Sequence, residues 1–220
     1  QHPSQRSSVV INDSTKCKCG VPDIDEQFFG GIHRNSHILL TGHIGSGKSL
    51  FARQFMMEGI RQQEHCLLLS LDDKKAHIQS SMKLNTDQSS LLTIHDASNW
   101  TGMTGQPWRN LDYIYDRLTN ECESSDFTRI VIDSISSGLA FWTTQELLQF
   151  INLCSQLPNA ENRCTLWCFN SHPSINDIEY HVSQSMDIGI ELQQHQDWYS
   201  GQILFSKWQR FSNVPIRIQN

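Results

Sequence analysis

The sequence predicts an α/β fold, with a mostly parallel, twisted sheet, helices on both of its faces and a C-terminal antiparallel extension. Three observations support this prediction. From Gly20 onward, short apolar runs alternate with segments of helical periodicity, which is typical of parallel sheets with helical crossovers. One apolar run leads through a glycine-rich loop directly into a helix. The last segments alternate apolar and polar residues at period two, as antiparallel strands with one solvated face do.

The parallel core is predicted from five apolar runs that have the length of strands. They cover residues 38–41, 66–71, 91–96, 129–133 and 164–170. The segments between them show the apolar spacing of amphipathic helices. They cover residues 49–63, 75–82, 111–121 and 143–156. Because helices separate these strands along the chain, we expect the strands to run parallel.

The two ends of the chain differ from this core. Residues 1–16 are rich in Ser, Gln and Asn and show little periodicity. We therefore expect a flexible N-terminal arm, in which residues 8–11 could pair as an edge strand. The expected antiparallel strands at the other end are 187–193, 201–207 and 215–219. Residues 17–220 are expected to form a single domain.

The composition favours one compact intracellular domain. At 220 residues the chain can bury a sizeable core. No apolar run reaches the length of a membrane span, so we expect a cytoplasmic protein without a membrane partner. The formal net charge of −6 has the wrong sign for a protein that coats nucleic acid. Seven scattered cysteines are typical of reduced thiols, and Cys17-x-Cys19 lacks a second ligand pair at zinc-site spacing.

The most specific motif is a phosphate-binding loop between the first strand and the first helix. It consists of Gly42, His43, Ile44, Gly45, Ser46, Gly47, Lys48 and Ser49. The glycines let backbone N–H groups turn onto phosphate oxygens, and the helix N-terminus adds partial positive charge. Lys48 is expected on the β- and γ-phosphates and the Ser49 hydroxyl on Mg²⁺. A glycine-rich turn without a ligand is the alternative, but all four defining positions are filled in the required strand–loop–helix context.

Asp133 supplies the second half of a nucleotide site. It ends a β-branched apolar run that fits the interior of a parallel sheet. Because open α/β sheets bind ligands at the carboxyl ends of their strands, Asp133 is expected in the coordination shell of Mg²⁺, directly or through water. The structural alternative is that its side chain caps the segment that follows.

Two further acids, Asp72 and Asp73, end the strand that follows the phosphate-loop helix. Adjacent carboxylates near a triphosphate repel each other and the ligand, so the pair would cost stability without a catalytic or metal role. Either acid could orient or deprotonate an attacking water. The spacing does not distinguish between the two. A helix N-cap before residues 74–78 remains the alternative.

Several motifs occur in a recognisable order. They are Gly-Val-Pro-Asp-x-Asp at 20–25, Gly-Gly-Ile at 30–32, the phosphate loop, Leu-Asp-Asp at 71–73, Ile-His-Asp-Ala-Ser at 94–98, Val-Ile-Asp-Ser at 131–134 and Phe-Ser-Lys at 205–207. Together they resemble the KaiC-like branch of the RecA/RadA ATPases, over about residues 17–219. The resemblance implies a RecA-like core, homo-oligomeric rings commonly of six subunits, and ATP bound between neighbours.

The resemblance also implies roles for single residues. Asp72 and Asp73 align with a catalytic Glu-Glu pair, and their shorter side chains imply slow turnover or binding with little hydrolysis. Lys207 matches a lysine that reaches the γ-phosphate of the neighbouring subunit. Its companion arginine should lie two residues on, but that position is Gln209 and Arg210 follows. Because one step in a strand reverses the side chain, either a bulge restores Arg210 or the site lacks this cation.

The leading functional hypothesis is a KaiC-like ATPase that binds ATP or ADP with Mg²⁺ and whose nucleotide state sets ring assembly and contacts with a protein partner. Only one core is present, so we do not expect a two-tier clock protein. The first alternative is a RadA-type recombination or repair ATPase. It would need basic DNA-facing loops, whereas residues 171–184 contain no Lys or Arg, so DNA is not the expected partner. The second alternative is an autophosphorylating kinase, for which no acceptor site is evident.

Overall fold

The computed structural model describes residues 15–97, 109–196, 198–208 and 216–218. The expected edge strand at 8–11 and Arg210 lie outside the described residues, as does most of the expected N-terminal arm. Lys16, which that arm was expected to include, lies in the two-residue strand β1 (Lys16–Cys17). That residues 17–220 form a single domain stays a prediction.

The predicted α/β architecture is confirmed by an eight-stranded sheet of order β10-β9-β8-β3-β7-β6-β4-β5. Its strands are β3 (Ser36–Gly42), β4 (His65–Ser70), β5 (Leu92–Asp96), β6 (Phe127–Asp133), β7 (Cys164–Asn170), β8 (Ile188–Gln194), β9 (Tyr199–Ser206) and β10 (Ile216–Ile218). All pairs from β8 through β3 to β5 are parallel. The pairs β8–β9 and β9–β10 are antiparallel, which confirms the C-terminal extension.

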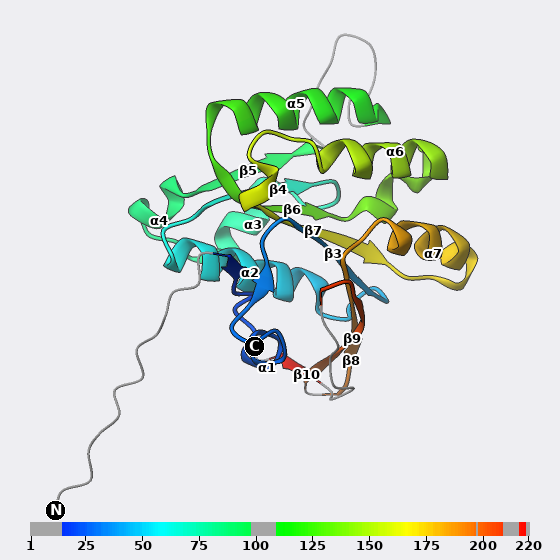
Figure 1. Ribbon diagram of the computed structural model, residues 1–220, viewed down its shortest axis with the longest axis horizontal. Coiled ribbons are helices and arrows are strands. Elements are labelled where there is room, and N and C mark those ends of the chain that lie inside the picture. The colour runs from blue at the N-terminus through cyan, green and yellow to red at the C-terminus, as the bar shows by residue number, and fades with distance from the viewer. Residues whose placement is uncertain (1–14, 98–108, 197, 209–215, 219–220) are drawn as a thin grey trace, which may run out of the picture.

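Helices cover both faces of this sheet (Figure 1). They are α1 (Pro22–Gln27), α2 (Lys48–Arg61), α3 (Lys75–Met82), α4 (Thr86–Ser90), α5 (Leu111–Ser124), α6 (Thr144–Cys154) and α7 (Asn176–Gln184). Alternate residues of the central strands point to two cores, as the pleat requires. Ile38 and Leu40 pack with α1, α2 and α3, whereas Leu39 and Trp167 pack with α5, α6 and α7. No helix in the described part of the chain has both the length and the apolar character that a bilayer crossing needs.

Two features of the fold differ from the sequence-based expectation. Residues 187–193 were expected in the antiparallel extension, but β8 extends the parallel core through its pairing with β3. The extension therefore begins at the β8–β9 pair. The second difference is the set of helices α1, α4 and α7, which the sequence did not indicate. They have six, five and nine residues, too few turns for a clear apolar period.

Candidate functional site

The phosphate loop lies between β3 and α2, as the motif predicts. Gly42, Gly45 and Gly47 have φ angles of +148°, +84° and +96°, a region that strongly favours glycine. A Cβ at Gly42 would also lie 2.5 Å from the Leu192 carbonyl oxygen. Gly47 is the N-cap of α2 and provides no side-chain cap. The first N–H groups of α2 therefore face the loop, where an anion can accept their hydrogen bonds.

Lys48 is held inside the curve of this loop. Its side chain is buried, and Nζ donates hydrogen bonds to the carbonyl oxygens of Gly42, at 2.9 Å, and His43, at 2.8 Å. Burial lowers the pKa of the Lys48 ammonium. These contacts place one positive charge at the centre of the loop, where phosphate oxygens would be neutralised.

The carboxyl ends of the parallel strands bring the predicted acids to the same edge. Gly42 pairs with Asn170 across β3 and β7, and Ser70 pairs with Asp133 across β4 and β6. A hollow of about 460 Å³ opens at this edge. It is lined by Ile44, Gly45, Gly47, Lys48, Ser49, Leu50, Arg53, Asp72, Asp73, Asp133, Ser134, Asn170 and Tyr199. The structure therefore gathers the loop and all three acids around one cavity.

Asp133 and Ser49, the two predicted metal ligands, are in direct contact. The Ser49 hydroxyl donates to Asp133 Oδ2 at 3.3 Å. Burial, followed by repulsion from Asp72, raises the pKa of Asp133 to about 6. In the described part of the chain, the 3₁₀ helix Ile135–Ala140 begins after Ser134 without a side-chain cap, so Asp133 does not play the capping role.

Asp72 and Asp73 face the same hollow from the segment after β4. The N-cap of α3 is Lys74, and the Lys75 N–H at the start of this helix donates to Asp96 Oδ2 at 3.3 Å, so the capping alternative is wrong for both acids. Partial burial raises the pKa of the Asp72 carboxyl. A hydrogen bond with Ser137 opposes this effect, and the charge of Asp73 adds to it. Of the two acids, Asp72 has the larger electrostatic effect on Asp133.

Lys207 lies at the opposite end of the sheet from the loop of its own chain. It follows Ser206, which pairs with Ile188, and Ile188 pairs in turn with Ile38 near the start of β3. Its Nζ is 3.4 Å from Asp187 Oδ1 and its side chain is half exposed. Lys207 is not among the described residues that line the hollow.

The lining residues to which the sequence assigned no role include Tyr199, Arg53 and Ser134. The Tyr199 ring packs on Gly47, where an added Cβ would lie 2.9 Å from Tyr199 Cδ1. Nothing in the sequence links these two positions, because 152 residues separate them. The position of Arg53 could be predicted from the sequence, because it lies one helical turn after Ser49. In the structure its Nε donates to the Ser49 carbonyl oxygen at 3.2 Å.

The donor set fits Mg²⁺ held together with a nucleotide. Ser49 and Asp133 offer hard oxygen donors, which Mg²⁺ prefers. Across the residues that the structure describes, no group of three or more His, Cys, Asp or Glu side chains could hold a metal by itself. A cation here would therefore share its shell with phosphate oxygens and water, as is usual for Mg²⁺ at a phosphate loop.

The chain is similar in sequence to a known family and to several known proteins. The family model for the KaiC ATPase domain matches residues 17–195. A UPF0273 protein of Aeropyrum pernix is 33% identical over 138 residues, which are 56% of this chain and 55% of that protein. Another, of Pyrobaculum aerophilum, is 29% identical over 53% of this chain and 47% of its own length. The circadian clock oscillator protein KaiC 1 of Synechocystis is 28% identical over 67% of this chain and 27% of its own length. Over these alignments, the chain spans about half or less of the curated relatives that it matches.

Proposed function

Because the chain belongs to the KaiC family of ATPases, we propose that it binds ATP with Mg²⁺, hydrolyses it slowly, and uses its nucleotide state to control ring assembly and contact with a protein partner. The observation that carries this proposal is the cavity at the carboxyl edge of the sheet. It combines the buried Lys48 of the phosphate loop with the Ser49–Asp133 contact and two further acids.

Each group has a role that its position supports. The loop N–H groups and Lys48 would bind the β- and γ-phosphates. Ser49 and Asp133 would hold Mg²⁺, which when bound would neutralise charge on the phosphate oxygens. Asp72 or Asp73 would orient the attacking water or accept its proton. Because an Asp side chain is one methylene shorter than Glu, its reach to that water is reduced, and slow turnover follows.

The two acids are expected to differ in their contribution. Asp72 is anchored by Ser137 and has the larger electrostatic effect on Asp133. Asp72→Asn should therefore lower the rate of phosphate release by about 100-fold, the usual order for loss of a general base. Asp73→Asn should lower it less. ATP binding, measured by calorimetry, should persist in both variants. Phosphate release by Asp72→Asn at the wild-type rate would contradict the assignment.

Ring assembly is supported by the position of Lys207. Its place near the start of β3 is far from its own phosphate loop, but it suits contact with the nucleotide of a neighbouring subunit. ATP would then join two chains and stabilise the assembly by mass action. Native mass measurement with and without ATP and Mg²⁺, followed by phosphate release, tests the proposed function. A monomer under every condition would contradict ring assembly, and absence of phosphate release would contradict hydrolysis.

Lys207 offers a sharper test of the subunit boundary. Lys207→Ala should lower hydrolysis and weaken ATP-dependent oligomerisation, while an isolated subunit still binds ATP. Mixing Lys207→Ala chains with Lys48→Ala chains should restore part of the phosphate release, because a mixed ring can pair an intact loop with an intact lysine. If mixtures shown by mass to contain both chains stay at the level of the inactive parents, Lys207 does not act in trans.

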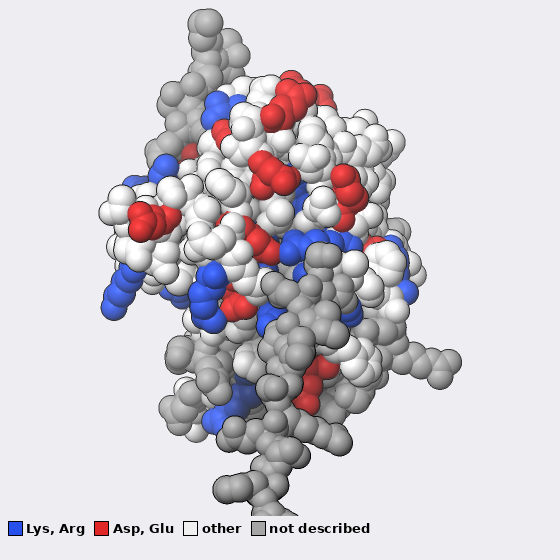
Figure 2. All heavy atoms as spheres, turned by 60° about the vertical axis from the view of Figure 1, so that its left-hand side comes forward, with Lys and Arg blue, Asp and Glu red and all other residues white. Residues whose placement is uncertain are grey.

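The recombinase alternative gains no support from the described residues. Asp177 and Glu179 lie in the first turn of α7, within the segment that would need basic side chains. On the face shown in Figure 2, positive and negative side chains lie interspersed. Non-specific affinity for DNA depends on phosphate-neutralising cations, so neither feature favours DNA binding.

A further inference from the structure

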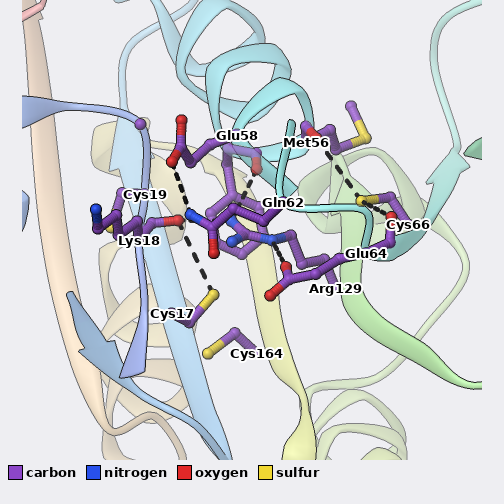
Figure 3. A network of polar contacts seen from close by, with 12 residues as sticks. Cys17, Lys18, Cys19, Met56, Glu58, Gln62, Glu64, Cys66, Arg129 and Cys164 are labelled. Carbon is purple, nitrogen blue, oxygen red and sulfur yellow. Dashed lines mark hydrogen bonds and ion pairs between the residues drawn. The ribbon is translucent and has the colours of Figure 1, made fainter. Parts of the chain in front are cut away.

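A second cluster of reactive groups lies at the amino edge of the sheet, opposite the phosphate loop. Cys17 of β1 and Cys164, the first residue of β7, are both wholly buried. Each thiol donates a hydrogen bond to a main-chain carbonyl oxygen, Cys17 to that of Lys18 at 4.0 Å and Cys164 to that of His33 at 3.5 Å, and the two side chains interact with each other. Figure 3 shows the two sulfur atoms next to one another, beneath the Arg129 side chain. Two cysteines from segments 147 residues apart therefore meet in one contact.

The surrounding charges favour a negative group at Cys17. Two guanidinium groups, those of Arg129 and Arg34, pair with the Glu64 carboxylate. Within the residues that the structure describes, Arg129 Nη2 is buried and has no hydrogen-bond partner. A buried cation without full compensation is costly, so a thiolate at Cys17 would balance the cluster.

Cys17 also differs from every other cysteine of the chain. The neighbouring Cys164 side chain, aided by the charge of Arg129, lowers the pKa of the Cys17 thiol against the opposing effect of burial. Burial raises the pKa of the thiols outside this pair, to about 12 for Cys66. The interaction with Cys17, followed by burial, raises the pKa of the Cys164 thiol, which donates to the His33 carbonyl oxygen at 3.5 Å. The pair thus combines one nucleophilic sulfur with one resolving thiol.

Access to the pair depends on a weak element of the fold. β1 has two residues and, within the described ranges, pairs with β2 (Ile32–His33) alone, in a small sheet separate from the eight-stranded one. The register joins Lys16 to His33 and Cys17 to Ile32. Opening of β1 would break the hydrogen bonds of Lys16 with Phe28 and of Arg129 with Lys18, but local opening of a short strand outside the main sheet still costs less than global unfolding. Opening of β1 would expose the Cys17 sulfur while the main sheet stays intact.

We propose that Cys17 and Cys164 are a redox-active pair that a peroxide converts into an intramolecular disulfide. The Cys17 thiolate attacks one oxygen of hydrogen peroxide and becomes a sulfenic acid, and the O–O bond breaks to release hydroxide, which takes up a proton to give water. The Cys164 sulfur then attacks the sulfenic sulfur, forms the S–S bond and releases a second water. Two thiols are oxidised and one peroxide is reduced to two waters.

The link would anchor β1 to the start of β7. It would therefore hold β1 against the main sheet, at the edge that lies away from the nucleotide cavity. ATP binding should be unchanged by oxidation, because none of the described residues that line the cavity belongs to this cluster. Failure of this inference can thus be distinguished from failure of the proposed function.

The test is to treat the wild-type protein with hydrogen peroxide, alkylate it in denaturant and determine the intact mass. The number of alkylated thiols should fall from seven to five, and peptide mapping should find a Cys17–Cys164 cross-link that a reductant removes. Seven alkylated thiols after oxidation, a link between another pair, or sulfinic acid at Cys17 without a link would each overturn the proposal. No variant is needed for this measurement.

Variants then assign the two roles. In Cys164→Ser the sulfenic acid at Cys17 has no resolving partner, so labelling by dimedone should rise at least tenfold over the wild type. Cys154→Ser is the matched control, because Cys154 is a buried cysteine of α6 outside the cluster. It should form the disulfide at the wild-type rate. Equal labelling of Cys164→Ser and the wild type would contradict the role of Cys164.

Discussion

Replacement of Lys48 by Ala is expected to abolish tight ATP binding. The substitution removes the buried ammonium that the Gly42 and His43 carbonyls hold at the centre of the loop. Truncating one partner of a charge-paired contact costs about 2–5 kcal/mol of binding free energy. That range corresponds to roughly a 30-fold to 5,000-fold increase in Kd. Isothermal titration with ATP and Mg²⁺ measures it directly.

The control for this prediction is a second lysine. Lys74 is exposed at the start of α3 and is absent from the described lining of the cavity, so Lys74→Ala should bind ATP as the wild type does. Because Lys48 is buried, its loss could also loosen the loop. Lys48→Met retains the aliphatic stem and separates the two effects. A folded Lys48→Met variant with wild-type affinity would contradict the proposed nucleotide site.

The second large effect is expected from Arg129, whose side chain is completely buried. Its Nη1 donates to the carbonyl oxygens of Lys18, at 2.6 Å, and Phe55, at 2.9 Å, and its Nε pairs with Glu64. Arg129→Met leaves both carbonyls and part of the Glu64 charge without a partner. The free energy of unfolding should fall by about 3–5 kcal/mol, the usual cost of breaking a buried ion pair. Denaturant titration provides the measurement.

An exposed ion pair on the same protein supplies the comparison. Arg61 pairs with Glu58 at 2.9 Å, but its side chain is 71% exposed. Arg61→Ala should therefore change the free energy of unfolding by less than about 1 kcal/mol. A loss below about 1 kcal/mol for Arg129→Met would refute the stabilising role of the network.

Local sequence patterns determined the parallel core and, in the candidate site, the phosphate loop and Asp133. The apolar runs at 38–41 and 129–133 became β3 and β6, because strand length and apolar character are properties of neighbouring residues. The phosphate loop was equally readable, since its function depends on consecutive glycines before Lys48. The end of a parallel strand predicted the location of Asp133 for the same reason.

Other features were decided only by the tertiary structure, because they join residues that are distant in the chain. A period of two does not distinguish a parallel neighbour from an antiparallel one, so the pairing of β8 with β3 followed from packing. In the sequence, the two carboxylates after β4 fit a helix cap as well as a catalytic role, and the start of α3 at Lys75 excludes the cap. The contacts of Tyr199 with Gly47, and of Cys17 with Cys164, exist because segments distant in the chain meet, the first at the phosphate loop and the second at the opposite edge of the main sheet. No local sequence pattern encodes these contacts. They depend on the order of the strands, which is set when both faces of the sheet are buried together.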